Sequence, residues 1–299
     1  MKFLPLLILL GACAGGESKS GKSDTSIDPA AGVVVKNQDF NRGKPLVYSP
    51  QQDYYPSPKE GAKSALENES AARDLNRIQK LTGGKDPLVV MMTNCYAKNF
   101  EQAFKVAESV YDSHQNLPTY WNQVATCYLL QGNERKALLF YNKALEVTPQ
   151  YVPALNNIGV MYEKNGQDQK ALVALQRALK NGKFTKTPRF NLGHLFLSYN
   201  LADEALPLFR GLADEAPADV DVRAGLANSL AQLNRWQDAW DEFSRIPEKD
   251  RRRSDVGLTM ALSAHRLGKE ALARDILQAT DVSDADQSYA ANLRRLIGE

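Results

Sequence analysis

Between residues 118 and 151, apolar and polar positions follow a helical period in two consecutive segments. Their apolar stripes consist of Trp121, Val124, Ala125, Tyr128, Ala137, Tyr141 and Ala144. Gly132 separates the two segments and Pro149 follows the second, so the pattern predicts two short helices joined by a tight turn. A single pair of this size cannot bury its own apolar face, which predicts that similar pairs stack beside it.

The same pattern recurs every 34 residues, without insertion, from residue 118 to about residue 287. The first segment repeats an apolar residue at Val124, Ile158, Leu192, Leu226 and Met260, followed each time by a small residue at Ala125, Gly159, Gly193, Ala227 and Ala261. The turn recurs at Gly132, Gly166, Asn200, Asn234 and Gly268. The second segment repeats an alanine, followed four residues later by a large side chain at Tyr141, Leu175, Phe209, Phe243 and Leu277. Small residues at fixed positions predict close approach between helices.

This period, with its recurring aromatic, small, turn and proline positions, resembles the tetratricopeptide repeat. The resemblance implies an all-α fold, a right-handed α-solenoid of about six helix pairs with N- and C-terminal capping helices. We expect the solenoid over residues 84–283, with repeats near 84–117, 118–151, 152–185, 186–219, 220–253 and 254–287. Amphipathic patterns over residues 59–82 and 284–299 predict the two capping helices.

The N-terminus predicts export and a lipid anchor. Residues 1–12 combine a basic residue with a short apolar run, as in a signal peptide. The ending Leu10-Gly11-Ala12-Cys13 resembles the bacterial lipobox, which implies acylation of Cys13; an ordinary secretory peptide cleaved nearby is the alternative. Residues 13–58 are rich in Gly, Ser, Lys, Asp and Pro and are expected to form a flexible tether. Ala14 after the cysteine favours the periplasmic face of the outer membrane.

Composition and motifs argue against several function classes. The net charge of +2 over 299 residues gives no electrostatic footprint for nucleic acid. His114, His194 and His265 are not close in register, and no catalytic, metal-binding or cofactor motif is present. We therefore expect no enzymatic activity and no cofactor.

The three cysteines match neither a disulfide scaffold nor a zinc pattern. Cys95 and Cys127 fall on first helices of adjacent repeats, so a disulfide between them is conceivable in an exported protein. Because they occupy different positions in the repeat, we expect instead two buried thiols that fill a helix interface.

The resemblance also implies where a partner would bind. In tetratricopeptide repeats, fixed positions of the first helices line a concave groove. The groove residues expected here are Met92, Asn122, Thr126, Leu129, Leu130, Asn156, Val160, Phe190, His194, Leu197 and Asn228. Their apolar members suggest an exposed strip that holds an amphipathic helix or an extended peptide. Alternatively, the tether or the helix predicted at residues 59–82 covers this strip.

These features together predict a lipid-anchored scaffold that binds an envelope protein and assists assembly of a cell-envelope machine. The chain resembles pilotin lipoproteins of type IV pili, and also repeat lipoproteins of outer-membrane biogenesis, peptidoglycan enzymes and motility. The alternatives left open are an accessory regulator of peptidoglycan or other envelope enzymes, and an enzyme whose site is not recognised.

Overall fold

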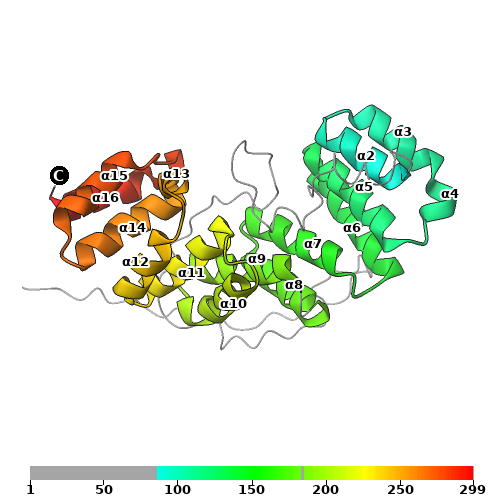
Figure 1. Ribbon diagram of the computed structural model, residues 1–299. Helices are drawn as coiled ribbons and strands as arrows, with labels where there is room; N and C mark the ends of the chain where they lie inside the picture. The colour runs from blue at the N-terminus through cyan, green and yellow to red at the C-terminus, as the bar shows by residue number, and fades with distance from the viewer. Residues whose placement is uncertain (1–85, 183–184, 299) are drawn as a thin grey trace, which may run out of the picture.

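The computed structural model describes residues 86–182 and 185–298, which fold into stacked pairs of antiparallel helices (Figure 1). The first helices of the six pairs are α2 (Pro87–Tyr96), α5 (Pro118–Leu130), α7 (Val152–Lys164), α9 (Lys186–Ser198), α11 (Val220–Gln232) and α14 (Ser254–Arg266). The second helices are α3 (Phe100–Ser109), α6 (Glu134–Val147), α8 (Asp168–Asn181), α10 (Ala202–Glu215), α12 (Trp236–Ser244) and α15 (Glu270–Ala279). The predicted all-α solenoid is confirmed.

Four shorter or terminal elements complete the described part. They are α4 (Tyr111–His114), α13 (Glu248–Arg251), the 3-10 helix η1 (Asp284–Asp286) and α16 (Gln287–Ile297). Ala290, Leu293 and Ile297 of α16 pack in one apolar cluster with residues of α14 and α15, so α16 caps the C-terminal end. The signal segment at residues 1–12, Cys13, the tether at 13–58 and the helix predicted at 59–82 lie outside the described residues.

The turn within each pair has the same backbone conformation at positions 34 residues apart. Gly132, Gly166 and Gly268 have positive φ angles, and Asn200 and Asn234 occupy the same position with φ angles of 56° and 59°. Glycine and asparagine tolerate this left-handed conformation, which explains why the sequence alternates between these two residue types there. In the first pair the same position holds Lys98, with a φ angle of 61°.

In the third and fourth pairs, a small residue of the first helix meets a large residue of the second helix. Gly159 approaches the neighbouring helix so closely that a Cβ atom on it would lie 2.7 Å from Cγ of Leu175. Leu175 and Phe209, at the predicted large position, are completely buried. The recurring small residues therefore make room for the large residues of the second helices.

The pairs follow one another along an arc (Figure 1). In the middle of the chain, α7, α9 and α11 lie on the inner side of this arc and α8 and α10 on its outer side (Figure 1). We name the surface of all six first helices, α2, α5, α7, α9, α11 and α14, the inner face.

The fifth pair departs from the pattern. Helix α12 ends at Ser244, and the short α13 follows Pro247 before α14 begins. Arg251 in α13 donates hydrogen bonds to the backbone oxygens of Ile246 and Ser244, at 2.7 and 2.6 Å. This part of the basic run at residues 251–253 therefore holds the junction between the fifth and sixth pairs together.

Candidate functional site

The inner face contains all eleven residues that the sequence predicted as partner contacts. Seven of them are buried: Met92, Asn122, Thr126, Asn156, Val160, Phe190 and His194. Four are half-buried: Leu129, Leu130, Leu197 and Asn228. The exposed apolar strip expected from the sequence is therefore reduced to three half-buried leucines. Partner binding by these residues stays a prediction.

Some predicted contacts stabilise the repeats themselves. The Thr126 hydroxyl donates to the backbone oxygen of Asn122 at 2.9 Å and lies 3.0 Å from the hydroxyl of Tyr141 on α6. Met92 belongs to the apolar cluster that runs from the first to the fourth pair. These side chains hold helices together, and in this structure they are not open to a partner.

Asparagine side chains connect three successive first helices of the inner face. Asn157 donates to Oδ1 of Asn122 at 3.2 Å, and Asn191 donates to Oδ1 of Asn156 at 2.8 Å. A longer bond of 3.4 Å joins Nδ2 of Asn156 to Oδ1 of Asn157. This chain of amides crosses α5, α7 and α9. Asn157 and Asn191 were missed by the sequence analysis, although their 34-residue separation was a usable signal.

His194 is held among aromatic rings. Its ring centroid lies 4.5 Å from that of Phe190 and 5.1 Å from that of Phe209, in edge-on arrangements. Burial, with a smaller effect of the positive charge on Arg253, lowers the pKa of His194 to about 3. The imidazole is therefore neutral near pH 7 and packs as an aromatic residue of the inner face.

Glu163, in the last turn of α7, is a buried carboxyl. Burial raises its pKa to about 8, and the neighbouring negative charge of Asp168 acts in the same direction. Near neutral pH this side chain is mainly protonated. It therefore adds little negative charge to the inner face.

A cluster of charged side chains lies at the C-terminal part of the inner face, between α11 and α14. Arg253 contacts carboxylate oxygens of Asp221 and Asp255, each at 2.7 Å. Burial raises the pKa of Asp221 despite the opposing effect of Arg253. Burial alone would lower the pKa of Arg253, but the two carboxylates raise it overall. Asn228 donates to the backbone oxygen of Asp255 at 3.2 Å, so this predicted contact residue also links α11 to α14.

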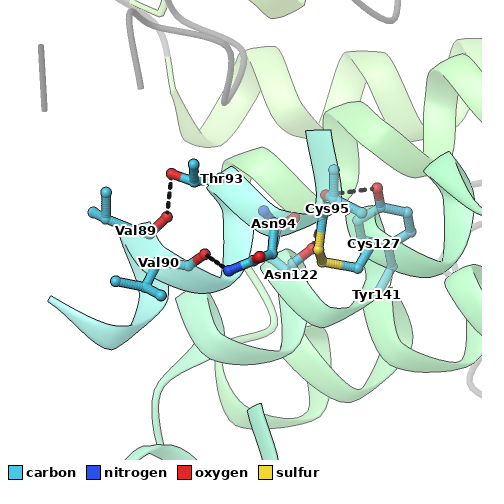
Figure 2. Close-up of a disulfide and its surroundings, with 9 residues drawn as sticks. Val89, Val90, Thr93, Asn94, Cys95, Asn122, Cys127 and Tyr141 are labelled. Atoms are coloured by element: carbon cyan, nitrogen blue, oxygen red, sulfur yellow. Dashed lines mark hydrogen bonds between the residues drawn. A yellow bond between two sulfur atoms is a disulfide. The ribbon is translucent and has the colours of Figure 1, made fainter. Parts of the chain in front are cut away.

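Cys95 and Cys127 form a disulfide between α2 and α5, with Cα atoms 5.3 Å apart (Figure 2). The expectation of two separate buried thiols was wrong. The register equivalent of Cys95 in α5 is Leu129, yet Cys95 meets the residue two positions earlier. Successive pairs of a solenoid are rotated against each other, so residues at different repeat positions can face each other across the boundary.

In the described part of the chain, no cluster of three or more His, Cys, Asp and Glu side chains is placed to hold a metal ion. The helices of this part also lack the length and apolar character that a membrane span requires.

Three family models, each described as tetratricopeptide repeat, match residues 97–150, 140–173 and 197–262. The chain therefore contains tetratricopeptide repeats, as its period predicted. Among curated proteins, the photosystem I assembly protein Ycf3 of Prochlorococcus marinus is 37% identical over 70 residues, 23% of this chain and 38% of that protein. Ycf3 of Cyanophora paradoxa is 30% identical over 86 residues, 28% of this chain and 47% of that protein. The chain thus spans less than half the length of these relatives.

Solved structures share the fold at low identity. A structure of pilF from Pseudomonas aeruginosa aligns with a TM-score of 0.59 at 16% identity, covering 69% of this chain and 96% of the other. YrrB, described as a tetratricopeptide-repeat protein with an unusual peptide-binding site, aligns with a TM-score of 0.53 at 19% identity, covering 63% and 97%. The tetratricopeptide repeats support a protein–protein interaction scaffold, and the solved structures share its fold.

Proposed function

We propose that this protein is an exported scaffold, anchored by a lipid on Cys13, whose inner face binds an envelope protein or peptide. In this role it assists assembly of a cell-envelope machine, such as a pilus or secretion apparatus, an outer-membrane biogenesis complex or a motility machine. The anchor would place it at the periplasmic face of the outer membrane. The repeats would hold a segment of the partner while other parts of the machine assemble.

The inner face carries this proposal. Six first helices in one register form a continuous surface with half-buried leucines at Leu129, Leu130 and Leu197 and polar groups beside them. Apolar contacts of this kind contribute affinity, and neighbouring polar groups fix the orientation of a bound segment. The assembly role is suggested by the curated relatives, which are named as assembly proteins.

The Cys95–Cys127 disulfide supports the proposed compartment. Disulfides form and persist in oxidising environments such as the bacterial periplasm and are rare in the cytosol. The lipobox-like ending at Cys13 and this disulfide are independent features of the chain, and both favour export.

The proposal is tested by affinity capture of the full-length chain after crosslinking in cells, with bound proteins identified by mass spectrometry. Cys13→Ser is the matched variant, because it removes only the acylated sulfur. We expect the wild-type protein in the membrane fraction and Cys13→Ser in the soluble fraction. Unchanged fractionation would contradict the anchor.

The identity of the captured protein tests the role. Recovery of a secretin, a barrel-assembly component or a motility protein would support assembly of that machine. Recovery of a cell-wall hydrolase alone would instead favour the alternative role as a regulator of envelope enzymes. Capture of cytosolic proteins only would overturn the proposed function.

A further inference from the structure

The boundary between the first two pairs differs from the other boundaries between first helices. Side-chain hydrogen bonds link α5 to α7 and α7 to α9 through the asparagines described above. Gln232 of α11 donates to the backbone oxygen of Leu197 in α9 at 3.1 Å, and Asn228 connects α11 to α14. Each of these four boundaries thus has a polar connection.

No such hydrogen bond joins a side chain of α2 to α5 among the described residues. Thr93 and Asn94 of α2 bond back to their own helix, to the backbone oxygens of Val89 and Val90, at 2.9 Å each (Figure 2). The chain of amides cannot continue into α2, because Leu88 occupies the position that Asn122 and Asn156 hold in the next repeats. Accordingly, Oε1 of Gln123, at the register position of Asn157, is buried without a hydrogen-bond partner.

The disulfide takes the place of the missing polar connection. It joins the last turn of α2 to α5 beside Asn122 and Tyr141 (Figure 2). Both cysteines are buried, with exposed fractions of 1% and 0%. A reductant can therefore reach the sulfur atoms only when the first pair moves away from the second. Reduction and separation of the two pairs are consequently coupled.

Besides the disulfide, the first pair meets α5 through ring contacts, such as Phe104 stacked on Tyr128 with centroids 4.4 Å apart, and through few fully buried side chains of α3. Helix α3 buries only Ala103 and Ala107, whereas α8 buries six residues. Two hydrogen bonds from side chains of α5 reach the first pair. The Tyr120 hydroxyl donates to the backbone oxygen of Ala107 in α3 at 3.1 Å. Nε1 of Trp121 donates to the backbone oxygen of Gln115, directly after α4, at 2.7 Å. Loss of the disulfide thus leaves α2 attached to α5 by apolar contacts.

We propose that the Cys95–Cys127 disulfide is a redox switch that controls docking of the first pair, α2 to α4, on the remainder of the solenoid. When the disulfide is closed, the first pair completes the N-terminal end of the inner face. When it is open, the first pair undocks and uncovers apolar surface around Met91, Met92 and Val124. This inference rests on the proposed function, because the N-terminal end of the inner face is part of the proposed binding surface.

The chemistry is thiol–disulfide exchange. A dithiol reductant supplies two electrons and two protons, so the S–S bond of Cys95–Cys127 breaks, two thiols form, and the reductant becomes a disulfide. A disulfide-bearing oxidant reverses the reaction by accepting the two electrons, and the two protons are released.

Hydrogen exchange read by mass spectrometry tests the switch on the full chain, oxidised and after reduction with dithiothreitol. We expect amides of α2 and α3 to exchange roughly 100-fold faster in the reduced protein, the effect of losing a native disulfide. Helices α14 and α15 serve as the internal control, because they hold the same register without cysteines, and they should change less than twofold. Unchanged exchange in α2 and α3 after complete reduction would overturn the inference.

A double variant, Cys95→Ala with Cys127→Ala, provides the matched comparison. It should show fast exchange in α2 and α3 with and without dithiothreitol. Slow exchange in this variant would also contradict the switch. If amides of α14 and α15 also exchange fast, the variant is globally unfolded. In that case the comparison of the oxidised and the reversibly reduced wild-type protein decides whether the switch exists. Partner capture by the oxidised protein tests the proposed function separately.

Discussion

The first and third helix pairs occupy the same repeat positions but are stabilised differently. In the third pair, nine residues of α7 and six residues of α8 are buried. In the first pair, only four residues of α2 and two residues of α3 are buried. The third pair combines the small Gly159 with the large Leu175, while the same two positions of the first pair hold Met91 and Ala107. Both pairs thus combine a large with a small residue at these two positions, and the terminal pair, which buries fewer residues, has a covalent link in addition.

One register position shows this contrast most clearly. It is occupied by Cys95 in the first pair, by Leu129 in the second and by Glu163 in the third. The same place on the scaffold therefore carries a disulfide, a half-buried apolar contact and a buried carboxyl. Repeat architecture fixes the backbone and leaves the chemistry of each position open.

The largest effect is expected in the core of the third pair. Leu175→Ala should lower the free energy of unfolding by about 2–5 kcal/mol, because Leu175 is completely buried against Gly159. Leu139→Ala is the control, since Leu139 is 63% exposed on α6, and it should change stability by less than about 0.5 kcal/mol. Urea denaturation measures both. Equal effects of the two variants would contradict size complementarity as the basis of the pair.

A second effect concerns the pH dependence of stability. The folded-state pKa of Glu163 is raised from 4.5 to about 8, so the native protein keeps a proton that the unfolded chain releases. The stability from this neutral carboxyl is complete below pH 4.5 and is lost as the pH rises through 8. Glu163→Gln stays neutral at every pH. Between pH 6.5 and 9 we therefore expect the wild type to lose at least about 1 kcal/mol more stability than Glu163→Gln.

Urea unfolding at pH 6.5, 8 and 9 measures this difference. His194, whose pKa is lowered to about 3, affects stability below pH 6.5, where the unfolded chain gains a proton, and so does not contribute in this window. Parallel pH profiles of the wild type and Glu163→Gln would show that Glu163 is ionised in the native protein.

A smaller effect is expected at the turn of the first pair. Lys98 holds a left-handed conformation that glycine adopts in three other pairs. Lys98→Gly should therefore stabilise the first pair by about 1 kcal/mol, and Gly132→Ala should destabilise the second by a similar amount. The urea midpoints of both variants measure this. A loss of stability in Lys98→Gly would indicate that the lysine side chain contributes more than the backbone strain costs.

The sequence predicted the helices well because their determinants are local. Gly132 and its equivalents mark the turns, and apolar residues at helical spacing mark the buried faces. The pairing of Cys95 with Cys127 depends on the rotation between successive pairs, which the period does not encode. Burial of Thr126 and His194 likewise depends on packing between elements. The half-buried Leu129, Leu130, Leu197 and Asn228 remain the predicted contacts that a partner could reach.

The central claim, that the inner face binds the partner, is tested most directly by comparing Leu129→Asp with Leu139→Asp in affinity capture of envelope proteins. Both variants place an aspartate where a leucine stood, one on the inner face and one on the exposed surface of α6. With both proteins shown to be folded by circular dichroism, we expect Leu129→Asp to reduce capture at least about tenfold, since it buries a charge against the bound segment. Leu139→Asp should capture as much as the wild type. Equal capture by both variants would contradict the claim.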